Sequence, residues 1–419
     1  VHGLERASRR PRSRRTMQTT ARFDDLPAYA FPRLRALLDG VAPGGPALAM
    51  SIGEPTHPFP AFVTEAMAGA AAGFGRYPPN EGTPGLRAAI SAWLRRRYGL
   101  SEERADPESR ILPLNGTREG LFAACLALVP AENNGARAAV LIPNPFYQCY
   151  AAAALAAGAE PVFVNATAET GHLPDFAALD PALLDRAAAL YICSPANPQG
   201  AVADAAYWRG LLALAERHDI RVFADECYSE IWRETPPPGA LEIAAAEGAD
   251  PERALVFHSL SKRSNLPGLR SGFAAGGPDA IARLLRLRAY GGAPLPLPAQ
   301  AAAEACWRDE DHVVANRALY AEKYALADEI LGNLPGYRAP EAGFFLWLRV
   351  GDGEAAARRL WAASGVRALP GVYLSRPTPQ GDPGAAFLRV ALVAPAPETR
   401  RGLEAIRDVL GDALSEDPA

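Results

Sequence analysis

Cysteine is scarce in this chain of 419 residues, and its few positions lack the spacing of a structural site. The five cysteines are scattered along the chain, and none forms a CxxC pair: Cys125, Cys149, Cys193, Cys227 and Cys306. An odd number with this spacing argues against a disulfide framework and against a zinc site, and it is typical of a protein from a reducing compartment. We therefore expect a cytoplasmic protein without a metal site.

Long apolar runs and an excess of one charge are also missing. No apolar run approaches the roughly 20 residues that a helix needs to cross a bilayer. The net charge of −4 leaves no electrostatic footprint for nucleic acid or for an anionic membrane. The hydrophobic fraction of 49% and the charged fraction of 21% are those of a soluble globular protein. We expect neither a membrane nor a nucleic-acid partner.

The length is too great for one small core and predicts two domains. Residues 1–20 are basic and poor in apolar residues, and no hydrophobic segment follows the arginines, so we expect a disordered tail, or sequence upstream of a start at Met17, and no secretory signal. We expect an N-terminal arm and part of a small domain over residues 21–60, a large domain over 61–300 and a small C-terminal domain over 301–419.

From about residue 110 to 275, short apolar runs alternate with mostly alanine-rich helical segments. The expected strands are residues 111–114, 138–142, 161–164, 188–193, 221–224, 254–257 and 272–275. This alternation predicts an α/β fold, with a mostly parallel sheet covered by helices on both faces and a smaller α/β domain beside it. Ligands of such sheets bind at the carboxyl ends of the strands, so the polar residues there are the candidates for a site.

One lysine stands at such a strand end among hydroxyl groups. Ser259, Ser261 and Lys262 follow the strand that ends at residue 257, and Arg270 comes eight residues after the lysine. This set suits a phosphorylated aldehyde, because the amine can form an imine while hydroxyls and guanidinium hold the phosphate. The alternative is a polar turn with a solvated lysine.

Other strand ends carry further candidates. Gly116 and Thr117 open a helix, where backbone N–H groups can bind an anion, although an ordinary threonine cap is the alternative. Tyr147 can cover a flat ligand or pack in the core. Asn197 lies in an Asn-Pro turn, which alone is weak evidence. Asp225 ends an apolar strand and needs a cation there, either a protonated pyridine nitrogen or a structural ion-pair partner.

Taken in order, these residues resemble those of the fold-type I pyridoxal-phosphate enzymes, specifically the class I/II aminotransferases, over nearly everything after residue 20. The resemblance implies pyridoxal 5′-phosphate as cofactor. It implies that Lys262 forms an imine with it and moves a proton during catalysis, and that Asp225 keeps the ring nitrogen protonated. Tyr228 and Asn197 would bond the ring's phenolic oxygen.

The same resemblance implies the remaining contacts. Tyr147 would stack on the ring, and the phosphate would be bound by Ser259, Arg270 and the Gly116–Thr117 amides. Tyr77 resembles the residue that such enzymes lend to the neighbouring subunit's phosphate, which implies a homodimer; a tyrosine packed in a proline-rich loop is the alternative.

The substrate side is also assigned by the resemblance. Arg389, alone in an apolar strand, needs a partner and resembles the family's clamp for the substrate α-carboxylate; a structural ion pair is the alternative. Gly53 would lie against the substrate.

The run from Ser261 to Arg270 looks like that of the succinyldiaminopimelate aminotransferases of lysine biosynthesis, which use glutamate as amino donor and N-succinyl-2-amino-6-oxopimelate as acceptor. Arg76 and Arg263 are candidates for the distal carboxylate or succinyl group. The alternatives are an aspartate or aromatic aminotransferase, a carbon–sulfur β-lyase, and a regulator that keeps the cofactor fold but would need a winged-helix domain ahead of it.

Overall fold

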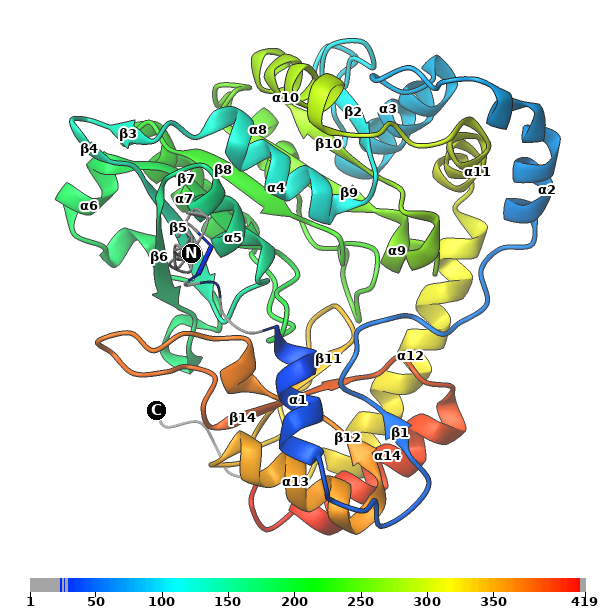
Figure 1. Cartoon of the computed structure of the whole chain (residues 1–419), viewed down its shortest axis with the longest axis vertical. Coiled ribbons are helices and arrows are strands. Elements are labelled where there is room, and N and C mark those ends of the chain that lie inside the picture. Colours follow the sequence, from blue (N-terminus) through cyan, green and yellow to red (C-terminus); the bar gives the residue numbers. More distant parts are fainter. Residues whose placement is uncertain (1–22, 25, 27–28, 415–419) are drawn as a thin grey trace, which may run out of the picture.

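The predicted α/β fold is confirmed by the computed structural model, in which residues 23–24, 26 and 29–414 are described (Figure 1). The predicted tail over residues 1–20 lies outside them. A seven-stranded sheet has the order β2-β10-β9-β8-β7-β5-β6. Its strands are β2 (Ile111–Leu114), β5 (Ala139–Asn144), β6 (Glu160–Asn165), β7 (Ala187–Cys193), β8 (Arg221–Asp225), β9 (Ala254–Ser259) and β10 (Gly272–Gly276).

One strand of this sheet runs against the others, and its direction builds the site. β10 is antiparallel to both β9 and β2, whereas the pairs β5·β6, β5·β7, β7·β8 and β8·β9 are parallel. The connection from β9 to β10, residues 260–271, holds only the short helix α9 (Leu260–Arg263) and a 3₁₀ turn. Because it does not cross the sheet, β10 starts at the edge where β9 ends. The residues of this connection therefore stay at the carboxyl edge of the parallel strands.

Helices cover both faces of the sheet because the strand side chains alternate between two apolar cores. In β7, Leu190 and Ile192 enter one core and Tyr191 enters the other. The first core takes residues from α3 (Pro84–Tyr98), α7 (Ala205–Arg217), α8 (Ala240–Ala246) and α11 (Leu297–Arg308), with α2 (Phe62–Gly69) packed beside α11. The second core takes residues from α4 (Thr117–Leu128), α5 (Cys149–Ala156) and α10 (Pro278–Gly291).

Segments from both ends of the chain build a second, smaller α/β unit (Figure 1). Its three-stranded antiparallel sheet has the order β11 (Phe345–Arg349), β14 (Phe387–Ala391), β13 (Leu369–Pro370), and β1 (Leu48–Ala49) pairs in parallel with β12 (Val366–Arg367). Around them lie α1 (Ala30–Leu38), α12 (Asp311–Leu331), α13 (Gly353–Ser364) and α14 (Ala396–Leu410). The exact domain boundaries at residues 60 and 300 stay a prediction. Among the described helices, none combines the length and the apolar character needed to cross a membrane.

The ends of the helices follow from local sequence. α3 begins after Thr83, whose hydroxyl accepts from the Leu86 amide, and Pro84 occupies its first position. The helix ends at Gly99, which has a φ of 64° that disfavours residues with a Cβ. α3 thereby presents a defined face to the sheet.

Trp93 is the centre of that face, and its removal tests the packing. The indole is 1% exposed and contacts the rings of Tyr98, His258, Phe273 and Trp307. Trp93→Ala should lower the free energy of unfolding by about 3–5 kcal/mol, because it leaves a cavity. Urea unfolding measures this, with Val314→Ala on the exposed face of α12 as the control, for which we expect a change within about 0.5 kcal/mol. Equal losses in both variants would contradict the account.

Candidate active site

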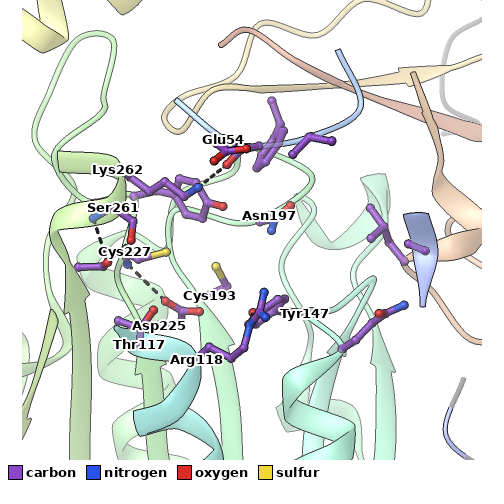
Figure 2. Close-up of a pocket in the computed structure, with 18 of the residues that line it drawn as sticks. Glu54, Thr117, Arg118, Tyr147, Cys193, Asn197, Asp225, Cys227, Ser261 and Lys262 are labelled. Carbon is purple, nitrogen blue, oxygen red and sulfur yellow. Dashed lines mark hydrogen bonds between the residues drawn. The ribbon is translucent and has the colours of Figure 1, made fainter. Parts of the chain in front are cut away.

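The predicted site residues meet around one cavity of about 300 Å³ at the carboxyl edge of the large sheet. Segments from the strand ends, from the start of α1 and from the smaller unit enclose it, and Figure 2 shows part of its wall. The predicted residues that line it are Gly53, Thr117, Tyr147, Asn197, Asp225, Tyr228, Ser259, Lys262, Arg270 and Arg389. Residues as distant in sequence as Gly53 and Arg389 therefore share one chamber.

Lys262 is held in the cavity by the short helix α9. The Ser259 hydroxyl caps this helix by accepting from the Ser261 amide at 3.0 Å. The Lys262 ammonium donates to the Gly53 carbonyl and forms no ion pair with a described residue. Burial lowers the pKa of Lys262 to about 8, with Arg389 and Arg270 acting in the same direction against Cys227 and Glu54. Its amine is therefore far more available as a nucleophile or base near neutral pH than that of a solvated lysine.

Asp225 lies at the end of β8 and is 4% exposed. The Tyr150 hydroxyl donates to its Oδ2 at 2.8 Å, and the Cys227 amide donates to Oδ1 at 3.4 Å. Burial raises the pKa of Asp225, and these two hydrogen bonds oppose the rise. No lysine or arginine of the described chain pairs with it, so the described residues do not supply the structural ion-pair partner considered from the sequence. The carboxylate lines the cavity.

Tyr150 is a site residue that the sequence analysis missed. It follows Tyr147 by three residues in the first turn of α5, and its ring stacks on Tyr191 with centroids 4.4 Å apart. Arg118 was missed as well: it comes directly after Thr117, lines the cavity, and donates through Nε to the Tyr147 hydroxyl. Figure 2 shows Arg118 beside Tyr147. Its position immediately after the predicted Gly116–Thr117 anion site was the signal that could have found it.

A cradle for an anion forms where α4 begins. Gly116 does not itself line the cavity, but it has a φ of 82°, and a Cβ there would lie 2.2 Å from Arg270 Nη2. Arg270 is held by the carbonyls of Pro267, at 2.8 Å, and Asn115, at 3.3 Å. Only glycine lets the guanidinium approach the helix start this closely, so the positive end of α4 and Arg270 face the same space.

Arg389 is buried on β14 without a carboxylate. Its Nη1 donates to Asn197 Oδ1 at 3.0 Å and its Nη2 to the Ser51 carbonyl at 2.8 Å, while Nε has no partner. The guanidinium lies 4.3 Å from the centre of the Phe345 ring, and burial lowers the pKa of Arg389 to about 10. No described residue forms an ion pair with it, so the described part of the chain does not supply the structural ion pair considered from the sequence.

Three predicted candidates lie away from the cavity. Tyr77 is fully exposed, and Arg76 beside it is exposed too. Arg263 is 2% exposed and faces away from the cavity: its Nη2 pairs with Glu310 at 2.6 Å, and its guanidinium lies 4.8 Å from the Trp307 ring. Its candidacy for the distal carboxylate is therefore wrong, because its charge is already compensated inside the protein.

The architecture and the cavity define an α/β protein with a buried lysine amine, a buried carboxylate and an arginine beside a helix start around one chamber. Comparison with known proteins identifies the family. A family model described as aminotransferase class I and II matches residues 46–406. The chain is 32% identical over 397 residues to the LL-diaminopimelate aminotransferase of Desulforudis audaxviator, covering 93% of this chain and 97% of that protein. It is 34% identical over 348 residues to the 4-dedimethylamino-4-oxo-anhydrotetracycline transaminase OxyQ of Streptomyces rimosus, covering 82% and 89%.

Solved structures give the same result. An aminotransferase from Neisseria meningitidis superposes with a TM-score of 0.88 at 38% identity, covering 93% of this chain and 99% of that one. A probable N-succinyldiaminopimelate aminotransferase from Thermus thermophilus superposes with a TM-score of 0.79 at 27% identity, covering 91% and 100%. The chain belongs to the class I and II aminotransferases, which are pyridoxal-phosphate enzymes.

The residues of the cavity fit that cofactor. Asp225 is a buried carboxylate without a lysine or arginine partner among the described residues, Thr117 at the start of α4 and Arg270 both line the cavity, and Lys262 has no ion-pair partner in the described part of the chain. These three features match a protonated ring nitrogen, a phosphate and an aldehyde, respectively.

Tyr150→Phe tests the hydrogen bond that the sequence analysis missed. Without the hydroxyl, the pKa of Asp225 should rise further and its carboxylate should pair less well with a cationic ring. A hydrogen bond to a charged group contributes about 1.5–3 kcal/mol, so we expect cofactor binding to weaken about 10- to 100-fold. Fluorescence titration of the apoprotein with pyridoxal phosphate measures this.

The matched control is Tyr191→Phe. Tyr191 stacks on Tyr150, but its hydroxyl donates to the Leu121 carbonyl at 2.8 Å rather than to Asp225. The control should bind the cofactor as the unaltered protein does. Equal weakening in both variants would assign the effect to ring packing instead of to the carboxylate.

Proposed function

We propose that this aminotransferase transfers the amino group between glutamate and N-succinyl-2-amino-6-oxopimelate, in the cytoplasmic biosynthesis of diaminopimelate and lysine. One observation carries the proposal: Arg389 and Arg118 both line the cavity, and neither forms an ion pair with a described residue. Glutamate and the succinylated acceptor both carry a second, distal carboxylate. Two guanidinium groups without an ion-pair partner among the described residues suit such substrates, because each can bind one carboxylate.

The assignment of roles follows the cavity geometry. Pyridoxal phosphate, when bound, supplies an electron-withdrawing ring that accepts the electron pair of the substrate Cα–H bond. Lys262 would take the proton from this carbon and deliver it to the former aldehyde carbon of the cofactor, a role that suits an amine with a pKa near 8. Asp225 keeps the ring nitrogen protonated, since a cation there relieves the cost of its buried charge.

The remaining groups bind and orient. Tyr228 and Asn197 hydrogen-bond the phenolic oxygen, and Tyr147 covers the ring. Ser259, Arg270 and the Gly116–Thr117 amides bind the phosphate. Gly53 lies against the substrate, and its lack of a side chain is required, because a Cβ there would lie 2.5 Å from the Phe345 ring.

Arg389 binds the α-carboxylate in this proposal. Its Nε has no hydrogen-bond partner among the described residues, and its Nη1 donates to the neutral amide of Asn197. A substrate carboxylate would therefore supply the counter-ion that the guanidinium lacks among the described residues. Arg118 binds the distal carboxylate. Its helix begins at the cavity, and its only hydrogen-bond partner through the side chain, among the residues described, is the Tyr147 hydroxyl.

Unacylated LL-diaminopimelate is a second candidate substrate, favoured by the names of relatives such as the Desulforudis protein. A free distal ammonium would need a carboxylate at the cavity. Glu54 is exposed there and has no ion-pair partner among the residues described. The succinylated substrate carries an amide in place of that ammonium, so Glu54 distinguishes the two.

The test compares amino donors with 2-oxoglutarate as acceptor: N-succinyl-LL-diaminopimelate, LL-diaminopimelate, aspartate, phenylalanine and, for lyase activity, cystathionine. We expect the highest kcat/KM with the succinylated donor. Arg118→Gln should lower that value about 10- to 100-fold, the worth of a hydrogen-bonded charge pair, and spare phenylalanine. Arg389→Gln should lower it for every donor. A higher kcat/KM with LL-diaminopimelate that falls in Glu54→Gln would instead establish the second candidate.

We also propose a homodimer in which Tyr77 reaches the neighbouring site. The support is exposure: Tyr77 at 101%, Tyr290 at 92% and Phe74 at 68% are large side chains left in solvent by a single chain. In a two-fold dimer, one subunit's Tyr77 would complete the phosphate site that the other subunit's Lys262 faces.

Hybrid dimers test this arrangement. Lys262→Ala should be inactive and Tyr77→Ala should bind the cofactor poorly. Mixed subunits restore one intact site in each hybrid, so a random equal mixture should regain about a quarter of the unaltered activity. Each variant mixed with itself is the control. A mixture no more active than its parts would show that Tyr77 does not serve the partner's site.

A further inference from the structure

A partly buried row of hydrogen bonds leads from α12 to the helix that carries Lys262. Lys323 Nζ lies 2.5 Å from His57 Nε2, and His57 Nδ1 lies 3.0 Å from Asn316 Oδ1. Asn316 Nδ2 then donates to the main-chain carbonyls of Lys262, at 3.2 Å, and Arg263, at 3.3 Å. We name this set the Lys323–His57–Asn316 chain. None of its three side chains lines the cavity.

The hydrogen bonds of the Lys323–His57–Asn316 chain all run in one direction, from Lys323 toward α9. A lysine ammonium only donates, so His57 Nε2 must accept, and the ring proton must lie on Nδ1. His57 Nδ1 therefore donates to the Asn316 oxygen, which leaves the Asn316 amide to donate to the α9 carbonyls. Donors and acceptors therefore alternate along the row, from the Lys323 ammonium to the carbonyls of α9.

His57 also belongs to the segment that forms the wall opposite Lys262. Gly53, four residues earlier, supplies the carbonyl that accepts from the Lys262 ammonium. Asn265, just after α9, donates to the Pro58 carbonyl at 3.3 Å and to Asn316 Oδ1 at 3.0 Å. Residues 53–58 and α9 are thus joined on both sides: at the cavity through the amine, and behind it through this chain.

Stability alone does not account for Lys323. Its side chain is 1% exposed and has no ion-pair partner among the residues that the structure describes. Burial lowers the pKa of Lys323 to about 8. An apolar residue of similar length would avoid the cost of burying that amine. What the amine provides is a fixed donor that sets the His57 tautomer.

We propose that the Lys323–His57–Asn316 chain positions the Lys262 amine by fixing α9 against residues 53–58, with His57 as the positioning residue. The proposal rests on the proposed role of Lys262 in proton transfer. Loss of the chain should slow turnover more than it weakens substrate binding, because the substrate carboxylates are bound elsewhere, whereas a small displacement of a reacting group is costly.

Acid should break the hydrogen bond between Lys323 and His57. A protonated His57 would set an N–H group against the Lys323 ammonium. The groups facing His57 are Lys323, Asn316, Glu322 and the Tyr320 ring, all from α12. Burial lowers the pKa of His57 and Lys323 adds to this, whereas the hydrogen bond to Asn316 and the charge of Glu322 oppose it. Since the unfolded chain takes up this proton first as pH falls below 6.5, the His57 contribution to stability is lost toward acid pH.

The experiment uses His57→Phe, Lys323→Met and the double variant in the cofactor-loaded enzyme. Phenylalanine keeps the ring that packs 4.7 Å from Tyr320 but makes no hydrogen bond. Each single variant should lower kcat about tenfold with little change in KM, in line with the cost of misplacing a reacting group. The double variant should have a kcat no lower than that of either single variant, because each single substitution already breaks the same row of hydrogen bonds. His57→Asn keeps a donor at the Nδ1 position, so its kcat should lie between that of His57→Phe and that of the unaltered enzyme.

Two readouts do not depend on turnover. In the apoprotein, the pH dependence of Lys262 labelling by an amine reagent should move from a midpoint near 8 toward 10.5 in His57→Phe, as the amine gains solvent. In the unaltered protein, ¹⁵N spectra of labelled histidine should show His57 protonated on Nδ1. His218→Phe is the matched control, since His218 pairs with Asp185 at 2.8 Å away from the cavity, and it should leave kcat and the midpoint unchanged.

A loss of stability with unchanged kcat and unchanged Lys262 midpoint would overturn the proposal, and so would a proton on Nε2 or additive effects in the double variant. Lys262→Ala separates this failure from failure of the proposed function. If that variant is inactive while His57→Phe is not impaired, only the positioning role falls. If Lys262→Ala keeps its turnover, the proposed role of Lys262 falls instead.

Discussion

The structure depends on one constraint: a lysine amine is kept inside a cavity without an ion-pair partner among the described residues. Burial lowers the pKa of Lys262 to about 8, and the nearby guanidinium groups of Arg389 and Arg270 act in the same direction. Asp225 is the complementary case, a buried carboxylate without a cation. Each isolated charge is costly, and both costs fall when a ligand bearing an aldehyde and a cationic ring nitrogen enters. The uncompensated charges of Lys262 and Asp225 therefore favour binding of the cofactor.

The topology places these groups. Because β10 returns antiparallel beside β9, the turn with Ser259, Lys262 and Arg270 remains at the edge where β7 and β8 end. The same edge receives the start of α4, and the smaller unit adds Arg389 from β14. The two units and the ends of β2, β5, β7, β8 and β9 thus meet at one chamber, so relative movement of the two units would change the distance between Arg389 and Lys262.

The sequence predicted what strand-end position and residue chemistry determine locally. The mostly parallel sheet followed from alternating apolar runs, and Lys262, Asp225 and Arg389 followed from polar residues interrupting them. Long-range packing decided the rest. Arg263 looked available until its partners Glu310 and Trp307, more than forty residues away, surrounded it. The contact between His57 and Lys323 joins residues 266 positions apart and leaves no local pattern.

The central claim is that the Lys262 amine and an amino-acid substrate exchange places at the bound cofactor. The absorption spectrum of the cofactor-loaded protein, recorded before and after adding glutamate without any oxo acid, tests this most directly. The account predicts a band at the edge of the visible range that moves into the ultraviolet as the amino group is transferred, and that returns when 2-oxoglutarate is added. A band that glutamate leaves unchanged, or no band after saturation with pyridoxal phosphate, would contradict it.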